Sequence, residues 1–358
     1  MNSFSNQKKK LSSWLATKDK VVKPLVLSNQ DQITEQPLLP TSPFPLLIRP
    51  KVPGLRLTSW VRDFQPLVEE KLWEHRALLF RNFVFDPDRD FSDFVTHTSK
   101  GERLSYRDRT TPRKELGNHI YTSTVYPADQ TIAQHNEGSY WTQWPLKLYF
   151  CCNLAPEEGG ETPLTDTRAV FEAIPEGIRK EFTSRGWRLC RNYNDGIGLP
   201  WQEVFQTENQ REVEAYCDQH HIHWEWQGKN HLRTWQIRQP TAIHPKTGHE
   251  VWFNHVAFFH ISSYDAEIRQ GLLASYSEEN LPYNTYFGDG GVIDTAVVAE
   301  IREAYDKATL AFPWQTRDVL LIDNMGISHG RRPYKGARLV TVAMTDPHPA
   351  SAEGGGNA

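Results

Sequence analysis

The sequence predicts a mainly β protein with flanking helices, whose core is a double-stranded β-helix, a variant of the jelly roll. Two observations lead to this fold class. Many short apolar runs are separated by turn residues, and only a few segments have helical periodicity. In addition, two groups of potential metal ligands lie far apart in the sequence, around His135 and at His329. A barrel of this kind brings the ends of distant antiparallel strands to one mouth, where such groups can meet.

The expected elements follow in chain order. Residues 1–53 are polar, Lys-rich and then Pro-rich, which predicts a flexible N-terminal arm with extended segments before a folded domain at 54–347. Within the arm, the apolar run at 46–48 could form a short edge strand. Apolar runs and helical periodicity predict strands at 77–83, 120–125, 130–137, 146–154, 187–193, 319–322 and 339–344, and helices at 59–75, 88–99, 168–172, 175–184, 213–220, 266–276 and 294–309. The largely polar segment at about 199–235 interrupts this pattern and is interpreted as an insertion. The small, polar tail at 348–358 is expected to be disordered.

The motif His135-Asn136-Glu137 is the most informative one in the chain. Residues i and i+2 of a strand point to the same side, so His135 and Glu137 can bind one metal if a strand ends there. His329 follows a buried strand and a turn, and can supply a second imidazole. Two imidazoles and one carboxylate on one face of a metal are diagnostic of non-haem iron(II) oxygenases. The motif alone is weak evidence, because H-x-E occurs by chance in a chain with 14 histidines.

Arg338 stands at the start of the strand that follows His329. A guanidinium at that position can bind a carboxylate through two parallel hydrogen bonds. The alternative is a solvated arginine, which is the common state of basic residues at strand starts.

Several motifs together resemble the taurine dioxygenase-like family of iron(II)- and 2-oxoglutarate-dependent oxygenases. The resemblance covers about residues 59–347 and is strongest to the branch with the syringomycin-type aspartyl hydroxylases of nonribosomal peptide pathways. It is carried by HNE at 135–137, GGET at 159–162, WFNH at 252–255, and HGR at 329–331 followed by Arg338. It implies that His135, Glu137 and His329 bind Fe(II), that Arg338 and Thr162 bind the carboxylates of 2-oxoglutarate, and that O2 is the second cosubstrate.

Two departures from taurine dioxygenase refine this expectation. Glu137 stands where that enzyme has aspartate; glutamate is usual in related branches, and an anionic ligand there disfavours halogenation. Val342 stands where that enzyme has the arginine that binds its substrate's sulfonate, so a sulfonate substrate is not expected here.

The resemblance implies hydroxylation of an unactivated C–H bond of an amino acid, either free or bound to a peptidyl carrier protein, with decarboxylation of 2-oxoglutarate to succinate. Desaturation and cyclisation are alternatives that use the same chemistry. The candidate substrate contacts are Tyr121, Gln134, Asn254 and Arg331. Asn254 could instead cap a turn, and Arg331 could instead pair with an aspartate, Asp323 or Asp346. Two other classes of protein remain open: a metal-binding jelly roll without redox activity, and an interaction module.

Composition limits the partners and the location. A net charge of −4 is too small to imply nucleic acid or an acidic membrane as a partner. No apolar run approaches the ~18 residues that span a bilayer, and 1–10 is polar and then basic, so a cytoplasmic protein without a secretory signal is expected. The four cysteines are expected to be reduced. The histidines at 220, 221 and 223 are more typical of a solvated face than of a second metal site.

Overall fold

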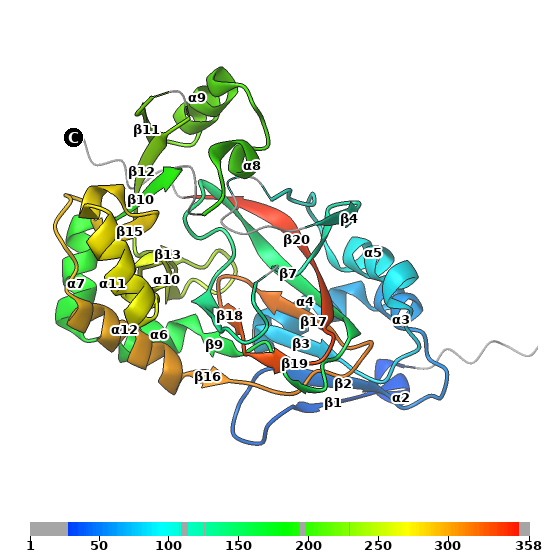
Figure 1. The fold of residues 1–358 in the computed structure, drawn as a ribbon. Coiled ribbons are helices and arrows are strands. Elements are labelled where there is room, and N and C mark those ends of the chain that lie inside the picture. The colour runs from blue at the N-terminus through cyan, green and yellow to red at the C-terminus, as the bar shows by residue number, and fades with distance from the viewer. Residues whose placement is uncertain are drawn as a thin grey trace, which may run out of the picture.

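Two facing sheets form the core of the protein (Figure 1). The structure, a computed structural model, describes residues 28–350 except 107, 109–113, 125, 194–197 and 229. The large sheet has the order β1-β2-β3-β17-β7-β20-β5-β4 and is antiparallel except between β2 and β3. Its strands are β1 (Ile33–Pro37), β2 (Leu46–Pro50), β3 (Ala77–Phe80), β4 (Glu115–Gly117), β5 (Ile120–Thr122), β7 (Gln143–Leu154), β17 (Val319–Asp323) and β20 (Leu339–Pro349). The smaller sheet has the order β16-β9-β18-β6, formed by β6 (Ile132–His135), β9 (Leu164–Asp166), β16 (Thr309–Leu310) and β18 (Ile327–Arg331).

Alternating apolar side chains on the large sheet build two separate cores. In β17, Val319 and Leu321 face one side, and Leu320 and Ile322 face the other. The first pair packs under three helices that cover the outer face, α3 (Leu57–Asp63), α4 (Gln65–His75) and α5 (Pro87–Thr98). The second pair packs with side chains of the smaller sheet. The large and the smaller sheet therefore enclose the second core between them, as expected for the predicted double-stranded β-helix.

The helix expected at 59–75 is two helices in the structure. The first ends at Asp63 and the second begins at Gln65, with Phe64 between them. Pro66 lies in the first turn of α4, where its missing N–H leaves no hydrogen bond unmade, whereas inside a continuous helix it would remove one. The N-cap is Arg56, not Ser59.

Beside the barrel the chain forms a helical layer with two small sheets, and a third small sheet lies at the barrel itself (Figure 1). The helices of this layer are α6 (Thr167–Ala173), α7 (Glu176–Arg185), α10 (Val256–Phe259), α11 (Ala266–Ser275) and α12 (Thr295–Lys307). A four-stranded sheet of order β11-β12-β10-β15 consists of β10 (Trp187–Tyr193), β11 (His223–Trp226), β12 (Leu232–Arg238) and β15 (Tyr283–Phe287). The two-stranded sheets pair β13 (Thr241–Ile243) with β14 (Glu250–Trp252), and β8 (Glu158–Gly159) with β19 (Tyr334–Lys335).

The expected insertion at 199–235 has a small apolar core of its own. It contains α8 (Trp201–Phe205), α9 (Gln210–Gln219), β11 and the first part of β12. The pairing of β12 with β10 joins the insertion to the four-stranded sheet. In Figure 1 this lobe stands above the barrel. Its buried residues include Trp201, Val204, Val213 and Leu232. We call residues 199–235 the lobe below.

The flexible arm expected at 1–53 is in part a folded element. From residue 29, the chain forms α2 (Asn29–Gln32), β1 and β2. The strand expected at 46–48 is thus present as β2, but it lies between β1 and β3 and not at the edge of the sheet, and it pairs in parallel with β3. Ile48 is fully buried in this sheet, which explains why the segment is ordered despite its prolines. Residues 1–27 lie outside the described part of the chain. At the other end, β20 runs to Pro349, and 351–358 are again not described.

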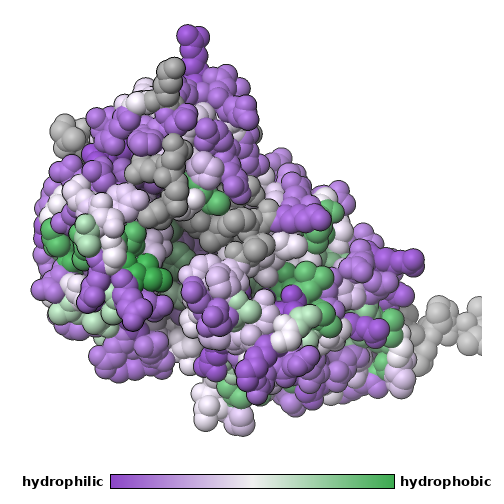
Figure 2. Space-filling model, in the orientation of Figure 1, coloured by the Kyte–Doolittle hydropathy of each residue, from purple (hydrophilic) through white to green (hydrophobic). Residues whose placement is uncertain are grey.

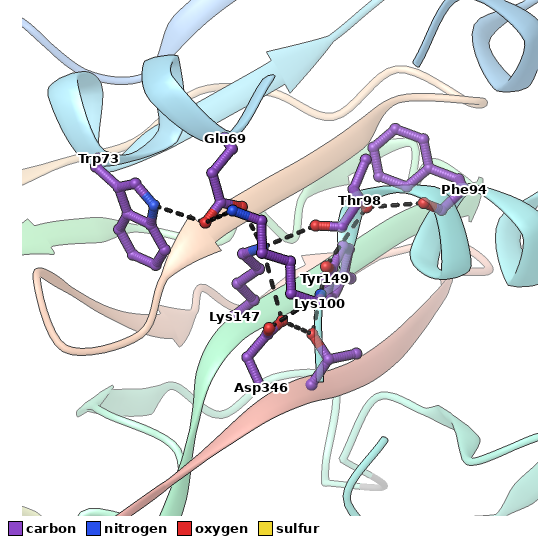
Figure 3. Close-up of polar contacts among 9 residues, drawn as sticks. Glu69, Trp73, Phe94, Thr98, Lys100, Lys147, Tyr149 and Asp346 are labelled. Atoms are coloured by element: carbon purple, nitrogen blue, oxygen red, sulfur yellow. Dashed lines mark hydrogen bonds and ion pairs between the residues drawn. The ribbon is translucent and has the colours of Figure 1, made fainter. Parts of the chain in front are cut away.

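A buried lysine ties the outer helices to the large sheet (Figure 3). The side chain of Lys147, from β7, is 1 % exposed, and its Nζ donates to Glu69 of α4 at 2.5 Å and to the carbonyl of Thr98 at 2.8 Å. Asp346 of β20 lies 3.6 Å from the same Nζ. A buried ammonium group with these partners has its charge balanced and its N–H donors hydrogen-bonded.

In the described residues, no helix is long and apolar enough to cross a membrane.

Candidate metal centre

The metal-ligand motif predicted from sequence comes together at the smaller sheet. His135 ends β6, and His329 lies opposite it on β18, as its partner in the antiparallel register. Glu137 follows two residues after His135. One nitrogen or oxygen atom from each of these three side chains lies within 4.8 Å of the others, and all three residues are buried. This is the separation at which three side chains can share one ion.

Hydrogen bonds hold the first histidine and its strand in place. The Nδ1 of His135 lies 2.9 Å from the carbonyl oxygen of Ala133. A carbonyl can only accept, so Nδ1 carries the proton and Nε2 has the lone pair that a metal requires. Phe258 packs against the His135 ring, with the ring centroids 5.1 Å apart, and Phe150 packs against His329 at the same centroid distance.

Asn324 fixes the backbone at the acidic residue. Its Oδ1 accepts the N–H of Glu137 at 2.8 Å, and its Nδ2 donates to the Glu137 carbonyl at 2.9 Å. Asn136 completes this clamp, because its side chain donates to the Asn324 carbonyl at 2.6 Å. No role for Asn324 was predicted from the sequence, although an asparagine directly after a buried strand is a common turn signal.

Tyr106 is a further residue at the site that the sequence did not indicate. Its hydroxyl donates to Oε2 of Glu137 at 3.1 Å, and the residue is 2 % exposed. No motif surrounds it, so only the tertiary structure reveals the contact.

One pocket contains both histidines together with Arg338 and Thr162. It is lined further by Ser123 and Val342, among others. The Nε of Arg338 donates to the Gly160 carbonyl at 3.0 Å, and Nη1 lies 3.4 Å from the Ser123 hydroxyl. No carboxylate of the described residues pairs with this guanidinium. Burial, and then the positive charge of Arg331, lower the pKa of Arg338 to about 10.

Thr162 is buried at the wall of the same pocket. Its Oγ1 accepts the indole N–H of Trp314 at 3.2 Å. The hydroxyl therefore keeps its own proton for an acceptor in the pocket. Gly160, two residues before it, has a φ of +68°, and a Cβ there would come within 3.1 Å of the Arg338 side chain. This glycine allows the turn to pass close to the arginine.

Arg331 binds backbone carbonyls instead of the aspartates considered from sequence. Its guanidinium donates to Tyr126, Pro127 and Gln130, at 2.5 to 3.0 Å. Asp323 accepts from His244, and Asp346 lies near Lys147 in the group formed by Lys147, Glu69, Thr98 and Asp346, called the Lys147 cluster below. Arg331 nevertheless lines the pocket of Arg338 and adds positive charge to it.

The other three candidate substrate contacts differ in their surroundings. Gln134 and Asn254 line a second, open cavity between β6 and the helices α10 and α12. Figure 2 shows this face of the molecule hollowed between the side with α11 and α12 and the side with β18 and β19. Both polar groups of Asn254 bind backbone, its Nδ2 to the Pro240 carbonyl and its Oδ1 to the Val256 N–H, which favours the turn-capping alternative. Tyr121 packs edge-on against Tyr106 at 4.8 Å and is 5 % exposed.

The remaining histidines have contacts of other kinds. His220 bonds to the Thr142 hydroxyl at 2.6 Å, and the ring of His223 stacks on Trp235. His255 lies 2.6 Å from the Ser139 hydroxyl. Within the described residues, His135, Glu137 and His329 are the one group of histidine, cysteine and acidic side chains that meets the spacing for a metal.

Comparison with known proteins decides the family. Residues 39–344 match the taurine catabolism dioxygenase TauD, TfdA family. The chain belongs to this family. It is 46 % identical to the dapdiamide synthesis protein DdaC of Enterobacter agglomerans over 286 residues, which cover 80 % of this chain and 87 % of that protein. It is also 27 % identical to a clavaminate synthase-like protein of Arabidopsis thaliana over 336 residues, 87 % of this chain and 96 % of the relative.

The fold agrees with that of solved oxygenases. The structure of PvcB from Pseudomonas aeruginosa aligns with a TM-score of 0.51 at 16 % identity, over 90 % of this chain and 93 % of that one. This TauD-family dioxygenase is therefore a non-haem enzyme that depends on iron(II) and 2-oxoglutarate. The two other classes left open by the sequence, the redox-inactive jelly roll and the interaction module, are not supported.

Proposed function

We propose that His135, Glu137 and His329 hold the iron(II) ion of this dioxygenase. The observation that carries the proposal is their convergence within 4.8 Å from two distant parts of the chain. The set also has the right chemistry, because two imidazoles and a carboxylate leave three positions open for cosubstrates. The bond from His135 Nδ1 to the Ala133 carbonyl fixes the tautomer that presents Nε2 to the ion.

Arg338 and Thr162 bind the distal carboxylate of 2-oxoglutarate in this proposal. A half-buried guanidinium without an anionic partner among the described residues costs free energy, as its lowered pKa shows. A carboxylate removes that cost and accepts two parallel hydrogen bonds from the guanidinium. Thr162 donates a further one. The pocket joins Arg338 to both histidines, so one small molecule can contact the anchor and the metal together.

The reaction proposed is hydroxylation of a C–H bond of an amino acid or a related small molecule. Bound iron and 2-oxoglutarate supply the activation of O2, with release of succinate and CO2. The protein orients the substrate and excludes water. DdaC is named for dapdiamide synthesis, which supports a role for this enzyme in the biosynthesis of a secondary metabolite. The same chemistry can lead to desaturation or cyclisation.

The cavity between β6 and the helices α10 and α12 is the proposed entrance for the substrate. It adjoins the metal centre, because Phe258 contacts both the cavity and the His135 ring. Its walls carry charges of both signs, from Arg302, Arg332 and Asp306. Such a lining suits a substrate with amino and carboxyl groups. The substrate enters as a free amino acid or attached to a peptidyl carrier protein.

An anaerobic titration tests this assignment. Fe(II) and 2-oxoglutarate are added to the protein, and the visible metal-to-ligand charge-transfer absorption of the chelate is recorded. We expect the absorption in the wild-type protein and its loss in His135→Ala and Glu137→Ala, with far-UV circular dichroism unchanged. Free and carrier-bound amino acids are then ranked by the shift that they cause. Turnover that persists in both variants would contradict the assignment.

A further inference from the structure

Tyr106 connects the acidic residue of the metal centre to a distant part of the chain. Its hydroxyl donates to Oε2 of Glu137 at 3.1 Å. The ring is buried and packs edge-on against Tyr121 at 4.8 Å and against Trp141 at 6.4 Å. Packing from two sides restricts the ring, so the position of the hydroxyl follows the position of the Tyr106 backbone.

That backbone is bound by the lobe. Gln206, the residue that ends α8, donates its side-chain amide to the Tyr106 carbonyl at 2.5 Å. Gln206 has a φ of +57°, a conformation that turns the chain sharply after the helix. The side chain at the C-terminal end of α8 therefore contacts the backbone of Tyr106, the residue that donates to Glu137.

A second anchor lies two residues further along. Asp108 is 3 % exposed and forms an ion pair with Arg191 of β10, and its carbonyl accepts the Tyr140 hydroxyl at 2.9 Å. Tyr140 is itself bound, since its carbonyl accepts from Gln236 and Arg238 of β12. These contacts join the Tyr106 region to the sheet that also carries the lobe.

We propose that Tyr106 is a positioning residue that sets the orientation of the Glu137 carboxylate, and that Gln206 makes this orientation depend on the lobe. The inference rests on the proposed role of Glu137 as an iron ligand. A carboxylate whose Oε2 accepts the Tyr106 hydroxyl would present its other oxygen to the ion, and would so leave positions for 2-oxoglutarate and O2. Partners of this kind around metal ligands usually matter for affinity.

The test compares Tyr106→Phe with the wild-type protein. The variant keeps the ring and removes only the hydroxyl. We expect the affinity for Mn(II), measured anaerobically in the full chain without substrate, to fall about 10- to 100-fold, the scale for loss of such a partner. We also expect the charge-transfer absorption of the Fe(II)–2-oxoglutarate complex to shift, because the electron density of the carboxylate changes. A purely structural role would not move this absorption.

Tyr140→Phe is the matched control. It removes a tyrosine hydroxyl that binds the same stretch of chain, at Asp108, but not Glu137. Because it loosens only the second anchor and leaves the Tyr106 hydroxyl on Glu137, it should lower the Mn(II) affinity much less than Tyr106→Phe does and leave the absorption unchanged. If it weakens Mn(II) binding as much as Tyr106→Phe does, the effect is general loosening and the proposal is overturned. Wild-type affinity and absorption in Tyr106→Phe would also overturn it.

Gln206→Ala tests the link to the lobe. It should lower Mn(II) affinity in the same direction as Tyr106→Phe but by a smaller factor, since the hydroxyl is still present. An unchanged affinity would overturn the role of Gln206. Failure of the underlying function is recognised separately: in that case the wild-type protein does not bind Mn(II), or His135→Ala binds it equally well.

Discussion

His135 and His329 stand directly opposite each other on β6 and β18, and their ring centroids are 4.3 Å apart. In an antiparallel pair, side chains of facing residues share one side of the sheet, so the register itself brings both imidazoles to one point. The register shifts between His329 and Arg331, which indicates a β-bulge beside the site. The proposed metal centre therefore depends on close contact between these two strands.

Gly330, inside this bulge, makes the close contact possible. A Cβ at this position would lie 2.5 Å from the carbonyl oxygen of Ile132, on β6. Gly330→Ala should therefore push β18 away from β6, separate the two histidines, and lower Mn(II) affinity by about tenfold or more. Gly177→Ala in α7 is the control, because nothing lies within 4 Å of its added Cβ. Equal Mn(II) affinity in Gly330→Ala and the wild-type protein would show that the strands adapt.

Removal of the Arg338 guanidinium should weaken the binding of 2-oxoglutarate more than that of the prime substrate. Arg338→Ala is expected to raise the KM for 2-oxoglutarate about 10- to 100-fold, the effect of losing a charged hydrogen bond worth about 1.5–3 kcal/mol. The KM for the prime substrate should change much less. Lys335→Ala removes a nearby positive charge that is exposed and paired with Glu158, and serves as the control. Equal changes in both KM values would give Arg338 a structural role.

The Lys147 cluster should contribute to stability and not to catalysis. Lys147→Ala leaves Glu69 in a partly buried position without its main partner, so the free energy of unfolding should fall by about 3–5 kcal/mol. Lys100 also contacts Glu69, at 3.3 Å, but its side chain is 71 % exposed. Lys100→Ala should therefore cost at most about 1 kcal/mol. Urea unfolding of both variants measures the difference, and equal losses would contradict this account.

His260 should make the protein less stable in mild acid. Burial lowers its pKa from 6.5 to about 4, and nearby Arg302 and Arg269 act in the same direction. Its Nδ1 accepts the N–H of Ser262, and its Nε2 lies 3.2 Å from the carbonyl of Ile293, so the neutral ring is the one that fits. Between pH 6.5 and about 4, the unfolded chain binds a proton here that the folded chain does not.

The free energy of unfolding should consequently fall as the pH drops through that window, by up to about 3 kcal/mol from this residue. His260→Gln removes the titrating group. Its unfolding free energy, followed by denaturant titration from pH 7 to pH 4, should decline less steeply than that of the wild-type protein. Parallel curves for the two proteins would exclude His260 as a source of the acid sensitivity.

Local sequence patterns were enough to predict most of the central strands and the metal-binding motif. Val319–Asp323 and Trp187–Tyr193 are apolar runs or alternations of strand length, and each forms a strand in the structure. The pair His135 and Glu137 was recognisable because two ligands at i and i+2 form a short-range pattern. Such features depend on neighbours in the chain, which a sequence displays directly.

The sequence by itself thus predicted the fold class and the candidate ligand motif. Tertiary structure alone decided that β2 joins the sheet beside β3, although its proline-rich surroundings are typical of a flexible arm. It also decided that Asn324 clamps Glu137 across 187 residues, and that Tyr106 donates to the same side chain. The reason is physical: a hydrogen bond between distant residues depends on register and packing of the whole barrel, and no local periodicity records either.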